Sequence, residues 1–390
     1  MNRCAFLSFL CFFLLSCAFP QTKQEFANAD DLAKSAPDSV ESSISSLSDY
    51  FLEYLASEKE LIRAFYFWTS NEIEYDIENM FNFSSSDNPK TIITETLHKR
   101  KAVCQGYAEV FHELCERAGI ESFVVFGYTK QNGHVVLINH AWAVARIDTN
   151  WYFFDPTWGS GAVINGKFTR KFTDEYFLVK PVNFIKSHMP FDPLWQCLYN
   201  PISPDNFAQG RSPGKASGNY FNYLDSIDVY KQSTTQEQLI GSLRRIQQNG
   251  GTNKALIEYQ DYLTTNLEIV RYNKQNEIQK EQVDKFNLAV HHYNTGTRLL
   301  NDYIAYWNRQ FKPIRSDAEI RRMVDTCDYQ LTRSRQILAE VQPQEEALRK
   351  NMDMLSTNVQ EIQKRVDEQK NFLREYFATS KSLRASLFRK

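Results

Sequence analysis

The sequence predicts an α+β domain followed by an all-α domain built as an antiparallel coiled coil. Residues 47–200 mix aromatic helical stretches with β-rich segments that Gly, Asn and Pro interrupt, which is typical of an α+β domain. Residues 252–311 contain no proline and a single glycine, Gly296, as a long helix requires. From residue 286 onward, apolar residues recur every three or four positions over several repeats, and this spacing predicts a coiled coil.

Length and composition exclude several classes of protein. A chain of 390 residues has room for two or three domains, at about 150 residues per domain. The 45 Lys and Arg residues balance 47 Asp and Glu residues, which argues against nucleic acid as a partner because such proteins carry a strongly basic surface. A hydrophobic content of 42% excludes a disordered chain. A mean hydropathy of −0.49 excludes a polytopic membrane protein.

Residues 1–20 are predicted to be a secretory signal peptide. Arg3 and the amino terminus supply positive charge, and residues 5–15 are apolar apart from Ser8 and Cys11. This apolar run is too short to span a bilayer, and small residues follow it, as in a cleaved signal. The alternative is a buried N-terminal helix. A signal peptide would place the protein outside the cytoplasm, in the cell envelope or secreted.

Two cleavage chemistries fit the end of this segment. Cleavage after Ala18 would use the small residues at positions 16 and 18. Residues 14–17 (LLSC) instead resemble a bacterial lipobox, in which case Cys17 would be lipidated and would anchor the chain to a membrane without crossing it. Beyond this segment the chain has four cysteines, which are too few for a disulfide scaffold: Cys104, Cys115, Cys197 and Cys327.

Composition also predicts where the domains begin and end. Residues 21–46 contain a polar stretch rich in Ser and Ala, and we expect a tether there. The α+β domain is expected over residues 47–200. Residues 201–220 are dense in Pro, Gly and Ser, which predicts a linker. A helical coiled-coil domain is expected over residues 221–390.

This helical domain is predicted to contain three long helices. The second begins at Ser316, where residues 316–319 have the form of a capping box, and Pro343 suits the first turn of the third. Because the connections between the helices are short, neighbouring helices must run antiparallel. The apolar seams are also compatible with binding of a helical-bundle partner. The seam residues are Phe286, Val290, Tyr293, Thr297, Leu300, Ile304, Trp307 and Phe311, then Val324, Cys327, Leu331, Ser334, Leu338 and Val341, then Leu348, Met352, Leu355, Val359, Ile362, Val366, Leu373, Tyr376, Ser380, Leu383 and Leu387.

The segment whose residues predict a catalytic site begins at Cys104. Apolar residues recur behind it at helical spacing as far as Gly119, so that Cys104 lies at or near a helix N-terminus. The free N–H groups and the positive end of the helix dipole favour the thiolate there, which is the form that attacks a carbonyl carbon. Cys115 and His112 lie farther along the same helix, and both are predicted to be structural.

A base for this thiol is predicted in the β-rich segment. In an antiparallel hairpin that turns at residues 148–150, His140 and Asp155 fall at the open ends of the paired strands and can be neighbours. An imidazole held by a carboxylate is the general base that a cysteine nucleophile needs. The rival base is His134, which lies beside Gly133 in a predicted turn.

Eight motifs occur in a fixed order in this region: residues 67–68 (FW), 75–76 (YD), 104–108 (CQGYA), 140–142 (HAW), 152 (Y), 155–159 (DPTWG), 176–178 (YFL) and 188–196 (HMPFDPLWQ). Together they resemble the transglutaminase-like superfamily, in particular its bacterial, kyphoscoliosis-peptidase-like branch. The resemblance covers residues 47–200. It implies a papain-like fold in which Cys104 is the nucleophile, His140 the base and Asp155 the residue that orients the base.

Two functions of different classes fit these residues. The first is a cysteine-dependent acyl-transfer enzyme that acts on peptide or glutamine amide bonds and forms a thioester, which water resolves in a peptidase or deamidase and an amine resolves in a transglutaminase. The second is a non-catalytic binding or scaffolding protein that uses the same domain and the coiled coil for protein–protein interaction. A protein or peptide is the expected partner, and no nucleic acid is expected.

Two further features of the site are predicted. No cofactor is expected, because a metal site at Cys104 and His140 would lack the companion ligands of a CxxC or HxxxH motif. The oxyanion would be met by the backbone N–H of Cys104 and by a second donor. Trp68 and Gln105 are the candidates for that second donor.

Overall fold

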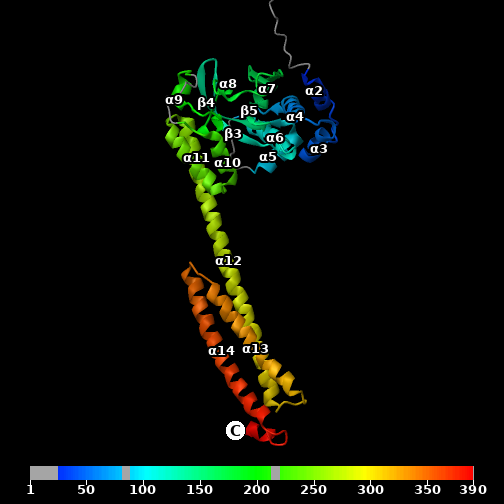
Figure 1. Cartoon of the computed structure of the whole chain (residues 1–390), viewed down its shortest axis with the longest axis vertical. Helices are drawn as coiled ribbons and strands as arrows, with labels where there is room; N and C mark the ends of the chain where they lie inside the picture. Colours follow the sequence, from blue (N-terminus) through cyan, green and yellow to red (C-terminus); the bar gives the residue numbers. More distant parts are fainter. Residues whose placement is uncertain (1–24, 81–87, 212–219, 390) are drawn as a thin grey trace, which may run out of the picture. The chain divides into compact units, whose positions relative to one another are not determined.

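The computed structural model describes residues 25–80, 88–211 and 220–389 (Figure 1). Its residues divide into two compact units, one ending at Leu267 and the other beginning at Glu268. The first unit mixes helices with strands and the second is helical, which confirms the predicted fold class. The predicted signal at residues 1–20, including Cys17, lies outside the described residues. Within the described ranges, no helix combines the length and apolar character needed to cross a bilayer.

The first unit begins with a layer of helices. These are α2 (Ala27–Lys34), α3 (Ile44–Tyr54), α4 (Glu58–Glu72), α5 (Pro89–Lys99) and α6 (Cys104–Arg117). Local side chains start three of them: the Ser43 and Ser57 hydroxyls and the Asn88 side chain each accept a hydrogen bond from a backbone N–H of the first turn, of α3, α4 and α5 respectively. At its other end, α6 stops as predicted, because Gly119 adopts a φ of +73° that glycine tolerates.

The central sheet has four antiparallel strands in the order β5-β4-β3-β8. Their bounds are β3 Ser122–Gln131, β4 His134–Ile147, β5 Asn150–Phe154 and β8 His188–Pro190. The predicted hairpin is present, with Ile147 opposite Asn150 and Ala143 opposite Phe154. Helix α6 packs against β3 and β4.

Shorter elements complete the first unit. Strands β1 (Glu74–Tyr75) and β2 (Lys101–Ala102) pair in parallel, whereas β6 (Gly161–Ile164) and β7 (Lys167–Arg170) form a hairpin. The short helices are α7 (Pro156–Ser160), α8 (Pro181–Phe184), η1 (Pro193–Gln196) and α9 (Pro204–Ala208).

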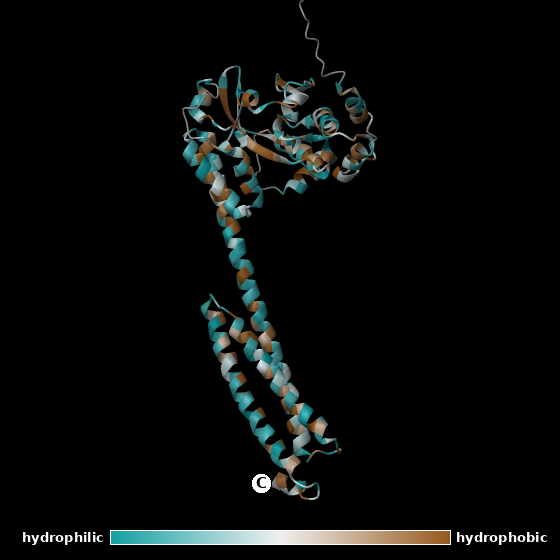
Figure 2. Ribbon diagram, viewed as in Figure 1, coloured by the Kyte–Doolittle hydropathy of each residue, from teal (hydrophilic) through white to brown (hydrophobic). Residues whose placement is uncertain are grey.

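Both faces of the central sheet are buried. Alternate residues of β4 point to opposite faces, so that Ala143 and Ala145 join the core under the helical layer, whereas Trp142 and Val144 join a second core on the other face. The sheet is accordingly among the most hydrophobic parts of the ribbon in Figure 2. A strand covered on both sides cannot slip in register without exposing apolar side chains. The register of the central sheet is therefore fixed.

The first unit is larger than the sequence predicted. Part of the predicted tether is helix α2, whose Ala29 and Ala33 are buried in the core together with Phe26. At the other end, α10 (Tyr223–Gln232) and α11 (Thr235–Asn249) pack on the sheet side of the same unit through Ile227 and Ile246. The expected linker at residues 201–220 is therefore followed by more of the same unit. Within this range, residues 212–219 lie outside the described residues.

The second unit contains the remainder of α12 (Lys254–Asn308), then α13 (Asp317–Glu340), α14 (Glu346–Ala378) and the short helix η2 (Arg384–Arg389). The predicted capping box at Ser316 is present. Two contacts show that α13 runs antiparallel to α12. His292 bonds Gln330, and the carbonyl of Ala289, earlier on α12, accepts from the hydroxyl of Ser334, later on α13. Most of the predicted seam is buried or half-buried in its two apolar clusters.

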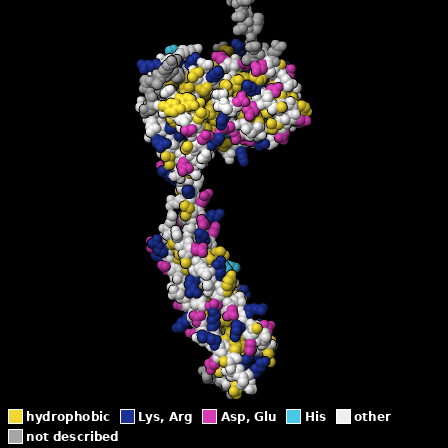
Figure 3. All heavy atoms as spheres, viewed as in Figure 1, with side chains coloured by type: hydrophobic (Ala, Val, Ile, Leu, Met, Phe, Trp, Pro, Cys, Tyr) yellow, Lys and Arg dark blue, Asp and Glu magenta, His cyan; other side chains and the backbone are white. Residues whose placement is uncertain are grey.

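The third helix differs from the prediction at both ends. It begins at Glu346 rather than at Pro343, and it ends at Ala378, so that Leu383 lies beyond it with 61% of its side chain exposed. The seam therefore stops near Tyr376. On the face seen in Figure 3, Lys and Arg side chains of this unit are interspersed with Asp and Glu, as expected for a solvated helical surface.

Candidate active site

Cys104 is the first residue of α6. Its N-cap, Val103, has an extended backbone and offers no side-chain hydrogen bond to the first turn. The thiol is 5% exposed and packs with Ala108 and Ala141. Gly106 permits this position, because a Cβ there would lie 2.5 Å from the Ala102 Cβ and collide with it. The sequence thus places a sulfur at the start of a helix whose leading N–H groups remain available for hydrogen bonding.

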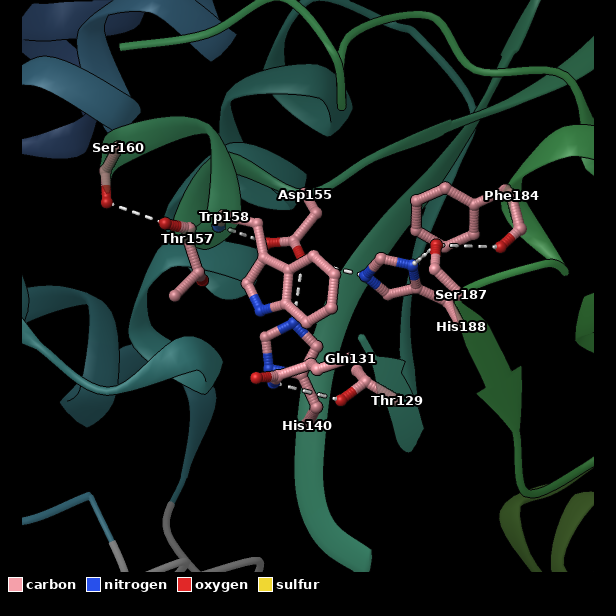
Figure 4. Close-up of polar contacts among 10 residues, drawn as sticks. All are labelled: Thr129, Gln131, His140, Asp155, Thr157, Trp158, Ser160, Phe184, Ser187 and His188. Atoms are coloured by element: carbon pink, nitrogen blue, oxygen red, sulfur yellow. Dashed lines mark hydrogen bonds and ion pairs between the residues drawn. The ribbon is translucent and has the colours of Figure 1, made fainter. Parts of the chain in front are cut away.

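His140 and Asp155 meet beside this helix, although 15 residues separate them. His140 lies on β4, and Asp155 follows β5 and serves as the N-cap of α7, accepting from the backbone N–H of Trp158 at 3.0 Å. The Nε2–H of His140 donates to Asp155 Oδ2 at 2.7 Å (Figure 4). Both side chains are buried, Asp155 completely. The hairpin register predicted from the sequence brings the two residues together.

The same imidazole also faces the sulfur. Because its Nε2 is directed to Asp155, Nδ1 is the ring nitrogen that remains for the interaction of His140 with Cys104. Burial disfavours the charged ring, but the charge and hydrogen bond of Asp155 outweigh burial and Cys104 adds to them, which raises the pKa of His140 to about 10. Burial likewise opposes ionisation of Asp155, yet its two histidine partners lower its pKa overall.

Trp158 covers the bond between His140 and Asp155. Its indole lies over the His140 ring, with centroids 5.6 Å apart and planes inclined by 34°, and meets Tyr176 edge-on at 5.2 Å. An apolar cover of this kind keeps water from competing for the hydrogen bond and lowers the local dielectric. The electrostatic hold of Asp155 on His140 is stronger as a result.

His188 is the member of the cluster whose position the sequence did not predict. It lies on β8, completely buried, and its Nε2–H donates to Asp155 Oδ2 at 3.1 Å. The motif at residues 188–196 marked it as part of the resemblance, but no local pattern indicates a partner 33 residues away. The carboxylate therefore accepts hydrogen bonds from two imidazoles.

The other residues singled out in the sequence lie elsewhere. His134 is exposed at the far end of β4, six residues from His140, about 20 Å along an extended strand. His112 bonds the Ser122 hydroxyl at 2.7 Å, and Cys115 is buried in the core, as expected of structural residues.

Neither candidate for the second oxyanion donor is directed to the sulfur by its contacts. The indole N–H of Trp68 donates to Glu41 at 2.6 Å, and the guanidinium of Arg100 stacks on the same indole. The Gln105 side chain bonds Glu109 one turn along α6. Backbone N–H groups at the start of α6 remain the donors that lie beside Cys104.

The buried histidines and aspartate also have the composition of a metal site. Within the described ranges, His140, Asp155 and His188 form a group whose ligand atoms all lie within 4.8 Å of one another. Two ligands of one zinc ion, each about 2.0–2.2 Å from it, stand about 3.3 Å apart in a tetrahedral site. The 2.7 and 3.1 Å separations between these nitrogens and the shared oxygen are hydrogen-bond distances, which the protons already on the rings explain.

We expect the replacement Asp155→Asn to lower the pKa of His140. The charge that holds the proton on the ring would be lost, and the imidazolium would deprotonate at lower pH. The sign for stability follows: a pKa raised from 6.5 to about 10 stabilises the fold fully below pH 6.5, and this contribution fades as pH rises to about 10. Asp155→Asn should flatten that part of the stability profile.

Nuclear magnetic resonance titration of the His140 ring measures this shift directly. Asp192→Asn is a matched control, because Asp192 is equally buried but bonds Arg245 and Ser242 instead of His140. An unchanged His140 titration in Asp155→Asn, in a protein that remains folded, would contradict the electrostatic account of the site.

The part of the chain that matches a known family includes Cys104, His140 and Asp155 and ends before Trp158 and His188. Residues 45–156 match the sequence model of the transglutaminase-like superfamily. The mouse kyphoscoliosis peptidase is 34% identical over 176 residues, which is 43% of this chain and 26% of that protein. The human kyphoscoliosis peptidase is 32% identical over 192 residues, 47% of this chain and 28% of that protein.

A third relative extends the match. The Lim and transglutaminase domain protein ltd-1 of Caenorhabditis elegans is 24% identical over 244 residues, which is 57% of this chain and 32% of that protein. The chain thus spans about a quarter to a third of the length of these relatives.

Proposed function

Since residues 45–156 belong to a domain of the transglutaminase-like superfamily, we propose that this protein is a cysteine-dependent acyl-transfer enzyme that acts on amide bonds of proteins or peptides. One observation carries the proposal: the imidazole of His140 is hydrogen-bonded to the Asp155 carboxylate at 2.7 Å and lies close enough to Cys104 for the cysteine to help raise the pKa of the ring. This is the arrangement that activates a thiol nucleophile.

The reaction would proceed through a thioester. The Cys104 thiolate adds to the amide carbonyl carbon, and N–H groups at the start of α6 stabilise the negative charge on oxygen. Protonated His140 then gives its Nδ1 proton to the departing nitrogen, and the C–N bond breaks. Water or an amine, deprotonated by the same imidazole, resolves the thioester and restores the thiolate. Asp155 remains ionised throughout and keeps the ring oriented.

Water and amine acceptors share the first half of this reaction. The curated relatives from mouse and human are named peptidases, which favours hydrolysis as the first activity to assay. Transfer to an amine would make the protein a transglutaminase, and hydrolysis of a glutamine side chain would make it a deamidase.

A binding or scaffolding role is the second candidate. The observation that favours it is the second unit, whose three antiparallel helices form a separate compact body with its own apolar core. Such a body could present a partner to the first unit or engage another helix. Export to the cell envelope, with or without lipidation of Cys17, stays a prediction from the sequence and would make envelope proteins or peptides the substrates.

We expect iodoacetamide to alkylate Cys104 at neutral pH faster than the same cysteine in the denatured chain. His140 can accept the proton of the Cys104 thiol, whereas burial raises the pKa of the other described cysteines, which should react slowly: Cys115, Cys197 and Cys327. His140→Ala should abolish the advantage, and His134→Ala is the matched control. Peptide mapping by mass spectrometry gives the rate for each cysteine. Reaction of native Cys104 no faster than in the denatured control would remove the main support for an enzyme.

A second assay separates the outcomes of the thioester. Incubation with glutamine-containing peptides and a fluorescent amine reports transfer when the amine is incorporated, whereas conversion of glutamine to glutamate or new peptide termini report hydrolysis. Ammonia is released from glutamine in both cases, because it leaves when the thioester forms. Rapid labelling of Cys104 with no turnover of any peptide would favour the binding role.

A further inference from the structure

The carboxylate of Asp155 is held by three donors. Its Oδ1 accepts from the Trp158 backbone N–H at 3.0 Å, and its Oδ2 accepts from His140 at 2.7 Å and from His188 at 3.1 Å. Two of these contacts are accounted for, since one caps α7 and one orients the base. The third comes from a completely buried histidine that the acyl-transfer mechanism does not use.

His188 is itself fixed on every side. Its backbone pairs with Thr129 in the central sheet, and its ring stacks on Phe184 with centroids 4.0 Å apart and planes inclined by 19°. Trp158 and Trp142 close the remaining sides at 4.5 and 5.2 Å. A ring packed in this way cannot turn to another partner without disrupting the core.

A hydrogen bond selects which nitrogen of His188 carries the proton. Its Nε2 faces the Asp155 carboxylate, which can only accept, so the proton lies on Nε2, and Nδ1 lies 2.8 Å from the Ser187 hydroxyl (Figure 4). Burial, only partly offset by Asp155 and reinforced by the charge of His140, lowers the pKa of His188 to about 4. The ring is therefore neutral at neutral pH, and His140 is the cation beside the carboxylate.

We propose that His188, as the Nε2–H tautomer, is a positioning residue of the Cys104 site that orients Asp155 toward His140. This inference rests on the proposed function. Without the third donor, Oδ2 would be held by His140 alone, and only the bond from the Trp158 N–H to Oδ1 would remain to resist rotation of the carboxylate about its bond to Cβ. His140 would then lose the fixed direction that keeps its Nδ1 on the sulfur, and small misplacements of reacting groups are costly.

The test compares two replacements of His188 that differ in one hydrogen-bond donor. His188→Phe keeps a ring of similar size and removes the N–H, whereas His188→Gln keeps an N–H that can reach Asp155. We expect alkylation of Cys104 to slow by about 10- to 100-fold in His188→Phe, the range seen when supporting hydrogen bonds are removed. His188→Gln should recover most of the rate.

A structural readout and a matched control accompany the rates. The resonance of the His140 Nε2 proton should be lost or shifted in His188→Phe and retained in His188→Gln, which a role in packing alone would not explain. His112→Phe is the control, since His112 also bonds a serine through Nδ1, at 2.7 Å, but lies about two turns along α6 from Cys104. It should leave alkylation unchanged.

Each outcome bears on one claim. Slow alkylation of wild-type Cys104 would count against the proposed function itself. Rapid alkylation in the wild type, with His188→Phe equally rapid, would overturn only the role of His188. If His188→Phe does not fold, His188→Met takes its place, because methionine fills a similar space without an N–H group; a wild-type rate in that variant would also overturn the proposal. Loss of wild-type reactivity after dialysis against a chelator would mean that a bound ion, and not an N–H group, holds Asp155.

Discussion

Replacing Cys104 by alanine should abolish the acyl-transfer activity, with a loss on the order of 10⁴-fold or more in turnover. Alanine keeps the helix and its N–H groups but has no sulfur to form the thioester. The stability of the fold should change little, because the thiol fills a small space beside Ala108 and Ala141. Peptide turnover and thermal unfolding of the two proteins measure the two effects.

Cys115→Ala is the matched control for this replacement. Cys115 lies about three turns along the same helix and is buried in the apolar core, away from His140 and Asp155. It should retain activity and lose some stability. Equal activity of Cys104→Ala and the wild type would show that another group carries the reaction.

Replacing Arg63 by methionine should destabilise the first unit by about 3–5 kcal/mol. The guanidinium is 1% exposed and bonds both oxygens of Asp30, at 2.6 and 2.8 Å, and Asp174 at 2.5 Å. Methionine would fill the space but leave two carboxylates without their cation. Because Asp30 belongs to α2, the loss should also release that helix.

Chemical denaturation gives the free energy of unfolding, and hydrogen exchange over residues 27–34 reports the release of α2. Lys99→Met is the matched control, since Lys99 and Glu95 form an ion pair whose side chains are 59% and 58% exposed. Exposed pairs contribute at most about 1 kcal/mol. If Arg63→Met were as mild as Lys99→Met, the ion network would have no part in anchoring α2.

The elements of the site that local rules govern could be predicted from the sequence. The start of α6 at Cys104 follows from helical spacing and from Gly119 at its end. The approach of His140 to Asp155 follows from a two-residue turn that fixes the register of its strands. The apolar seams of the helical unit likewise follow from the regular spacing of apolar residues, every three or four positions, in the sequence.

Non-local packing accounts for what the sequence did not predict. Helices α10 and α11 are amphipathic, and their pattern is the same whether they pack on a sheet or in a bundle, so the unit boundary at residue 267 was missed. The contact of His188 with Asp155 joins two segments that no periodicity relates. Leu383 fits the helical spacing of α14 in the sequence, but the helix ends at Ala378, before that residue.

The two-residue turn between β4 and β5 has a consequence for how the chain can vary. His140 and Asp155 lie at the end of the hairpin farthest from the turn, so that substitutions at residues 148 and 149 leave their separation unaltered. A single-residue insertion between residues 141 and 147 would instead reverse the direction of the imidazole, because neighbouring side chains of a strand face opposite ways. Length changes in this hairpin are therefore tolerated only where they preserve the register, and position 148, whose φ is +56°, favours Asp, Asn or Gly.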